Sequence, residues 1–327
     1  MKEVYLLRRP VEAITEHDFL VARAPALVPG QGEVLTKTLY ISLDPYLALR
    51  MRREIPDQLS GPPYPIVGRT IGQVIEAGSS GFAEGDLVLG FGRWRTYDAR
   101  PAGDLRRIDP SDTPPAAYLG ALGHSGFTAW LGLAIGLPKA SETFVVSGAA
   151  GAVGSIAGQL AKQRGCRVIG IAGGAAKCEQ VITELGFDDC LDHQQPDLSG
   201  RLRTLAPNGI DLHFENVGSK TLDPVLANMR PRSRIVLCGL VQHYQDAAPI
   251  SFANFRLLLE RSIRLEPFSI YDHQDQAERA QQELIAAVRS GSLRFAQTVT
   301  EGIDQVPKAF VAMLAGQGTG KHLALVA

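Results

Sequence analysis

The sequence predicts an α/β fold in which a doubly wound parallel sheet is combined with a smaller domain of β-strands. Three observations predict it: strand-like runs fill residues 1 to about 120, strand and helix patterns alternate after residue 122, and a glycine-rich turn joins a buried strand to a helix at 144–154. At 327 residues the chain is longer than most single domains, so we expect two.

The composition is that of a globular protein with no bulk charge. Hydrophobic residues make up 45% of the chain, and 33 basic residues against 34 acidic ones leave a formal net charge of -1. This balance argues against binding of nucleic acid or of an anionic membrane through a net positive charge. No apolar run is long enough to span a bilayer and the first residues lack a signal-peptide core, so we expect a cytoplasmic protein whose partner is a small molecule.

Cysteine and histidine spacing predicts no metal site. The four cysteines, none in a C-x-x-C pair, are Cys166, Cys178, Cys190 and Cys238. We expect them to be buried, reduced thiols. The seven histidines include no H-x-x-x-H pair, and isolated ones are expected to pack or to lie in polar loops.

The first region is predicted to be a small barrel or sandwich. Its strand-like runs are 4–7, 33–40, 71–76 and 86–90. Glycine, proline and other turn-forming residues separate these runs, and short strands at such spacing close into compact β structures.

The second region alternates strands and helices, which is typical of a parallel sheet with right-handed crossovers. After a helix at 124–135, strands are expected at 143–147, 167–172, 188–191, 210–214, 234–238 and 263–267, with helices at 152–164, 175–185, 197–205, 219–228 and 275–290. A strand at 295–300, a helix at 305–314 and a strand at 323–326 return to the first domain. The expected domains are 122–291 and 1–121, the latter completed by 292–327.

The glycine-rich turn is a candidate phosphate site. Gly148, Ala149, Ala150, Gly151 and Gly154 carry small or no side chains where the strand turns into the helix expected at 152–164, so a phosphate can approach the helix N-terminus. Ala149 occupies the first position of the G-x-G-x-x-G pattern, and taken alone the stretch is equally consistent with a simple glycine-rich turn.

The end of the second strand indicates the cofactor. An acid there would bind the ribose 2′-OH of NADH, but the sequence has Gly173 and Gly174 followed by Lys177. The glycines leave room for a 2′-phosphate and the lysine can pair with it, which favours NADPH. A solvated helix lysine is the alternative for Lys177.

With no metal predicted, an enolate oxygen formed by hydride addition to a conjugated carbonyl needs one hydrogen-bond donor. Asn216 and Tyr244 follow the fourth and fifth strands, where ligands of such sheets bind. Tyr244 offers a neutral phenol at pH 7, and its alternative role is that of a loop residue covering the cofactor.

Five motifs together resemble a known family. They are Y-I-S-L-D-P-Y at 40–46, G-F-T-A-W at 126–130, V-S-G-A-A-G-A-V-G-S at 146–155, E-N-V-G at 215–218 and the closing Gly320-Lys321. The chain resembles the zinc-independent branch of the medium-chain dehydrogenase/reductase superfamily, in the group of leukotriene B4 dehydrogenases, prostaglandin reductases and alkenal double-bond reductases. The likeness runs nearly end to end.

The resemblance implies a GroES-like barrel, a Rossmann domain, NADPH as cofactor, and reduction of the carbon–carbon double bond of enals or enones by a homodimer without zinc. Tyr244 matches a tyrosine proposed to hydrogen-bond the substrate carbonyl. The matching cofactor positions are Thr128, Gly151, Ala152, Val153, Gly154, Gly173, Lys177, His193, Asn216, Cys238, Gly239, Leu240, Tyr244, Phe268, Ser269 and Ile270.

Two departures from the family bear on the cofactor. His193 stands where many relatives have a tyrosine that contacts the 2′-phosphate, and it follows Asp192. Gly318 stands where relatives often have an asparagine. Two other functions stay open at this point: a quinone reductase of the same superfamily, and a non-catalytic NADPH-binding protein. The physiological substrate is not identified by the sequence.

Overall fold

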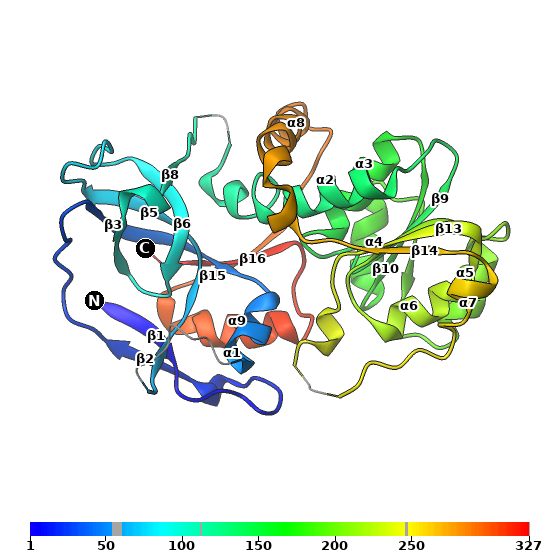
Figure 1. The fold of residues 1–327 in the computed structure, drawn as a ribbon, viewed down its shortest axis with the longest axis horizontal. Coiled ribbons are helices and arrows are strands. Elements are labelled where there is room, and N and C mark those ends of the chain that lie inside the picture. The colour runs from blue at the N-terminus through cyan, green and yellow to red at the C-terminus, as the bar shows by residue number, and fades with distance from the viewer. Residues whose placement is uncertain (54–60, 112, 246–247, 327) are drawn as a thin grey trace. The chain divides into compact units, whose positions relative to one another are not determined.

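A computed structural model describes residues 1–53, 61–111, 113–245 and 248–326. The chain divides into two compact units, described separately below (Figure 1). The first consists of Met1–Leu119, Tyr244–Asp246 and Gln297–Ala327, and the second of Gly120–His243 and Ala247–Ala296. The domain limits expected from the sequence, 121/122 and 291/292, stay predictions.

The second unit contains a six-stranded sheet in which every pair of neighbours is parallel. Its strands are β9 (Thr143–Ser147), β10 (Arg167–Ala172), β11 (Asp189–Asp192), β12 (Ile210–Glu215), β13 (Met229–Leu237) and β14 (Arg264–Pro267). The spatial order β11-β10-β9-β12-β13-β14 is the arrangement of a doubly wound dinucleotide-binding fold. The predicted fold class is therefore confirmed.

Helices cover both faces of this sheet. They are α2 (His124–Gly136), α3 (Gly154–Gln163), α4 (Ala175–Thr183), α5 (Leu198–Leu205), α6 (Ser219–Leu226) and α7 (Leu257–Glu260), and a further helix, α8 (Ala277–Arg289), packs against α2. Leu202 of α5 and Leu222 of α6 share a buried cluster with Val145 on one face. On the other face, which carries the alternate residues of each strand, Phe214 lies against Gly132 of α2.

The first unit is built from two sheets. One has the order β2-β1-β4, and the other has the order β15-β16-β3-β5-β6-β8 with β7 paired to β3. The strands are β1 (Lys2–Leu6), β2 (Phe19–Arg23), β3 (Glu33–Leu43), β4 (Tyr64–Pro65), β5 (Val67–Glu76), β6 (Leu87–Arg93), β7 (Tyr97–Pro101), β8 (Arg106–Arg107), β15 (Gln297–Glu301) and β16 (Lys321–Leu325). Strand β16 pairs with β3, so the end of the chain adds to this sheet.

The remaining helices are short. They are α1 (Tyr46–Arg52) and α9 (Val306–Leu314), with 3₁₀ turns η1 (Glu16–Asp18), η2 (Ala102–Asp104), η3 (Pro115–Leu119), η4 (Val241–His243), η5 (Ile270–Gln276) and η6 (Ile303–Gln305). The core of the first unit centres on Trp94, which is fully buried and meets Phe310 edge-on with ring centroids 5.5 Å apart. None of the helices in the described ranges is long and apolar enough to cross a membrane.

Strand β7 was not predicted, because its buried positions are charged. Asp98 and Arg100 point inward, where Arg95 Nε donates to Asp98 at 2.7 Å and Arg100 donates to the carbonyl of Phe91 at 3.0 Å. Buried charges are tolerated when they are paired in this way. An alternation of charged residues gives no apolar signal from which a strand could be recognised.

Candidate cofactor site

The predicted cofactor residues of the second unit follow the carboxyl ends of all six parallel strands, with Thr128 on α2 as the exception. Gly151–Gly154 follow β9, Gly173 and Lys177 follow β10, His193 follows β11, Asn216 follows β12, Cys238–Leu240 follow β13, and Phe268–Ile270 follow β14. Parallel strands end at one edge of the sheet, and ligands of open α/β sheets bind there. The topology thus gathers these segments at one edge.

The β9–α3 turn is shaped for close approach to the backbone. A side chain at Gly154 would place its Cβ only 2.3 Å from the carbonyl oxygen of Gly148, so glycine is required where α3 begins. No side chain caps α3, and in its first turn the N–H groups of Ser155 and Ala157 donate to the carbonyls of Gly151 and Val153 in the preceding turn. The positive end of the helix dipole lies at this turn. This is an arrangement that binds an anion.

Alanine at the first position of the glycine pattern is explained by packing. Ala149 is fully buried, and a Cβ added to Gly170 of the neighbouring strand would lie 2.8 Å from the Cβ of Ala149. The methyl group of Ala149 therefore occupies space that a glycine in β10 leaves open. The turn keeps its backbone course, with Ala149 N–H donating to the carbonyl of Ile171 at 3.0 Å.

Glu215 organises the loop between β12 and α6. Its side chain is 0% exposed, and its Oε1 accepts hydrogen bonds from Ser147 Oγ at 2.9 Å and from the Gly218 N–H at 2.8 Å. The Val217 N–H and the Thr221 hydroxyl also donate to Oε1. A buried carboxylate is stable only with such a set of donors. Glu215 belongs to the E-N-V-G motif at 215–218, but the sequence alone predicts no role for it.

His213 completes the support of this carboxylate. The ring is 0% exposed, with Nδ1 3.0 Å from the carbonyl oxygen of Val145 and Nε2 2.7 Å from Glu215 Oε2. A carbonyl oxygen can only accept, so Nδ1 donates to Val145, while Nε2 faces the carboxylate. The buried pair thus holds the loop from the side of β12.

Asn216 is held in a single orientation by this loop. Its backbone N–H donates to Ser147 Oγ at 2.8 Å, and its side-chain Nδ2 donates to the Ser147 carbonyl at 2.7 Å. The carboxamide is thus positioned before any ligand binds.

The segment after β13 is attached to the same loop. Cys238 and Gly239 both donate their N–H groups to the carbonyl of Glu215, at 2.9 and 3.1 Å, and Val241 donates to the carbonyl of Asn216 at 3.2 Å. Burial, and then the charge of Glu215, raises the pKa of the Cys238 thiol to about 12. Cys238, Gly239 and Asn216 are therefore neighbours, and Cys238 is an uncharged thiol.

The segments after β10 and β11 also meet. A Cβ added to Gly173 would lie 3.1 Å from His193 Nε2. His193 Nδ1 is buried with no hydrogen-bond partner in the described chain. Burial, and then the charge of Lys220, lowers the pKa of His193, and burial lowers the pKa of Lys177. Lys220, at the start of α6, cannot be predicted from the sequence as a neighbour of His193, because no spacing rule relates it to β11.

The carboxylate of Asp192, the residue before His193, is hydrogen-bonded to the backbone. Its Oδ1 accepts the N–H of Gly174 at 2.8 Å and the N–H of Gln194 at 2.9 Å, and these bonds lower its pKa. Asp192 therefore links the turn after β10 to the turn after β11. The orphaned ring nitrogen of His193 and the lysine at 177 fit a phosphate group, which supplies both negative charge and acceptor oxygens.

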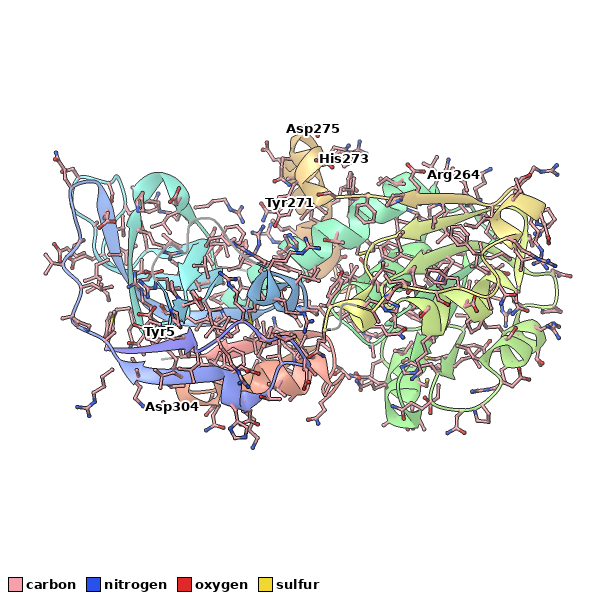
Figure 2. All side chains as sticks on the ribbon, turned by 60° about the horizontal axis from the view of Figure 1, so that its bottom comes forward. Tyr5, Arg264, Tyr271, His273, Asp275 and Asp304 are labelled. Atoms are coloured by element: carbon pink, nitrogen blue, oxygen red, sulfur yellow. The ribbon has the colours of Figure 1, made fainter. Side chains whose placement is uncertain are left out.

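The other predicted residues lie on α2 and after β14. Thr128 Oγ1 donates to the carbonyl of His124 at 2.7 Å, and Phe268 meets Phe214 edge-on at 6.4 Å. Ser269 Oγ accepts the N–H of Tyr271, the residue after Ile270 that is labelled on η5 in Figure 2. Their contact with a cofactor stays a prediction.

Tyr244 belongs to the first unit. It is half-buried and packs against the cluster that contains Trp94. The residue before it, His243, belongs to the second unit, where its Nε2 lies 3.3 Å from the Ser219 N–H. The catalytic role of Tyr244 stays a prediction.

Two family profiles match the chain. One described as "Zinc-binding dehydrogenase" matches residues 152–286, and one described as "N-terminal domain of oxidoreductase" matches residues 2–108. The described residues contain no group of three or more His, Cys, Asp or Glu side chains that could hold a metal ion. Within the ranges that the structure describes, no set of donors fits the metal named in the first description, and we assign it no ligand.

Individual relatives extend over nearly the whole chain. The NADPH-dependent curcumin reductase of Escherichia coli is 38% identical over 98% of this chain and 96% of its own. The NADP⁺-dependent 2-alkenal reductase of Nicotiana tabacum is 36% identical over 91% of this chain and 88% of its own. The crystal structure of CurA from Vibrio vulnificus in complex with NADPH is 34% identical, with a TM-score of 0.93 and coverage of 100% of this chain and 99% of that one.

Proposed function

The chain belongs to the zinc-independent reductase group of the medium-chain dehydrogenase/reductase superfamily, and on that basis we propose that it is an NADPH-dependent alkenal and enone reductase. It reduces the carbon–carbon double bond of α,β-unsaturated aldehydes or ketones. The similarity to reductases of curcumin, 2-alkenals, pulegone and prostaglandins supports this reaction class.

The observation that carries the proposal is the set of segments at the carboxyl edge of the parallel sheet. The uncapped start of α3 suits the pyrophosphate, and Lys177 with His193 suits the 2′-phosphate. Asn216, anchored through Ser147, offers an oriented carboxamide for hydrogen bonding. NADPH, when bound, supplies the hydride.

Residues of this chain stabilise the negative charge that develops on the carbonyl oxygen of the substrate. Tyr244 donates its phenolic hydrogen bond to the substrate carbonyl oxygen, which becomes an enolate oxygen as hydride reaches the β carbon. One preorganised donor at such an oxygen contributes a large rate factor. Glu215 contributes by holding the loop that orients Asn216.

The proposed enzyme is a cytoplasmic homodimer. The family resemblance supports the dimer, and the near-neutral formal charge of the chain gives it no electrostatic attraction to an anionic membrane. Analytical ultracentrifugation of the purified protein measures the first of these directly.

A spectrophotometric screen tests the function. The purified protein is assayed at 340 nm with enals, enones and quinones, with NADPH and NADH in parallel. We expect turnover of enals and enones with NADPH, and products in which the carbonyl is retained. Preferential turnover of quinones would assign a quinone reductase, and NADPH binding without turnover of any acceptor would assign a non-catalytic protein.

Lys177→Ala is expected to raise the KM for NADPH by about 10- to 100-fold, the cost of one hydrogen bond to a charged group, with a much smaller effect on NADH. Steady-state kinetics with both cofactors check this. Lys139→Ala, which removes an exposed lysine in the same unit, is the control and should leave both KM values unchanged. Equal losses with the two cofactors would contradict a 2′-phosphate contact.

A further inference from the structure

Two cysteines from different elements lie close together near Lys177 and His193, the residues that we propose contact the 2′-phosphate. Cys178 lies in α4 and Cys190 in β11, and their Sγ atoms are 3.0 Å apart. Both are free thiols, Cys178 buried and Cys190 half-buried. Cys166 and Cys178 are buried as expected, and Cys190 and Cys238 are partly buried. A disulfide bond is about 2.05 Å long, so the sulfur atoms need to approach by only about 1 Å.

The sheet leaves space for this pair. Cys190 is in register with Gly170 of β10, and a Cβ added to Gly170 would lie 3.1 Å from Cys190 Sγ. Because Gly170 has no side chain, there is room for the Cys190 sulfur beneath α4. Cys166 is arranged differently, because its thiol donates to the carbonyl of Lys139 at 3.2 Å.

The pair joins the two segments that carry the phosphate contacts. Cys178 follows Lys177 directly, and Cys190 stands three residues before His193. The same segments are already linked through Asp192, which accepts the N–H of Gly174. A covalent bond between the sulfur atoms would draw the first turn of α4 toward the end of β11, and both phosphate-binding side chains would shift.

We propose that Cys178 and Cys190 are an oxidative modification site, and that a reversible disulfide between them weakens the binding of NADPH. The proposal rests on the proposed function only for the identity of the ligand. The oxidant is a hydroperoxide: one thiolate attacks the peroxide oxygen to give a sulfenic acid and an alcohol or water, and the second sulfur displaces water from that sulfenic acid. The two thiols lose two electrons and two protons in total, and the O–O bond is reduced.

Burial sets the rate of this oxidation. It raises the pKa of both Cys178 and Cys190, and the charge of Asp192 acts in the same direction. Since the thiolate is the reactive form, little of it is present at neutral pH and oxidation should accelerate as the pH rises. The disulfide would accordingly form under sustained peroxide exposure.

The test uses the full chain treated with hydrogen peroxide at pH 7 and pH 9. Digestion without reductant and mass spectrometry should find a peptide pair joined through Cys178 and Cys190, and more of it at pH 9. The dissociation constant for NADPH, measured by calorimetry, should rise by about tenfold, since a 1 Å displacement is enough to weaken a positioned contact. Dithiothreitol should restore it.

Variants separate the disulfide from general damage. Cys178→Ser and Cys190→Ser should each keep their NADPH affinity under peroxide, while Cys166→Ser should respond as the wild type does. Absence of the linked peptides, or a linked protein with unchanged NADPH affinity, would overturn the proposal. Neither readout requires turnover, so a failure of the enone assay alone would bear on the proposed function and not on this site.

Discussion

Replacing Tyr244 with phenylalanine is expected to lower kcat for enone reduction by about 100-fold, because the change removes one hydrogen-bond donor to the enolate oxygen. The aromatic ring, which packs against the core around Trp94, is retained, so the first unit should keep its stability. The dissociation constant for NADPH should stay within about twofold, since binding and the transition-state contact are separate contributions.

Stopped-flow measurement of hydride transfer under single-turnover conditions checks this, together with calorimetric titration of NADPH. Tyr97→Phe removes a hydroxyl from a partly exposed tyrosine on β7 and is the matched control. Full hydride-transfer rates in the Tyr244 variant with intact NADPH binding would remove this residue from the mechanism. The enzyme would then need another donor at the carbonyl oxygen.

Glu215→Ala is expected to lower the free energy of unfolding by about 3–5 kcal/mol, the usual result when one partner of a buried charge pair is removed. The change leaves His213 with an unmatched ring nitrogen, and the Ser147 hydroxyl and the Gly218 N–H lose their acceptor. Urea denaturation monitored by circular dichroism measures the loss.

Glu215→Gln keeps the volume of the side chain and separates stability from positioning. Its amide can still accept one of the bonds, so the variant should fold, while the orientation of Asn216 is relaxed and the KM for NADPH rises. Glu179→Ala, at an exposed position on α4, should change the unfolding free energy by no more than about 0.5 kcal/mol. An alanine variant at 215 as stable as the wild type would show that the network does not hold the loop.

Local patterns of hydrophobic residues in the sequence predicted most strands of the parallel sheet. The buried runs that became β9, β10 and β12 alternate with amphipathic helices, and each signal lies within a few residues of the element it predicts. Helix α3 begins at Gly154 instead of at 152, because the turn before it continues through Val153. Such a boundary depends on the path of the backbone and not on hydrophobic spacing.

The sequence by itself determined the fold class, the reductase family and the order of the loops at the sheet edge, because these depend on short-range periodicity and on contiguous motifs. Only the tertiary structure decided which side chains meet there. Ser147 and Glu215 are 68 residues apart, yet strand pairing between β9 and β12 places them in contact. Cys178 and Cys190 meet because α4 packs over β11. Pairings of this kind arise from the packing of whole elements, and no local pattern in the chain encodes them.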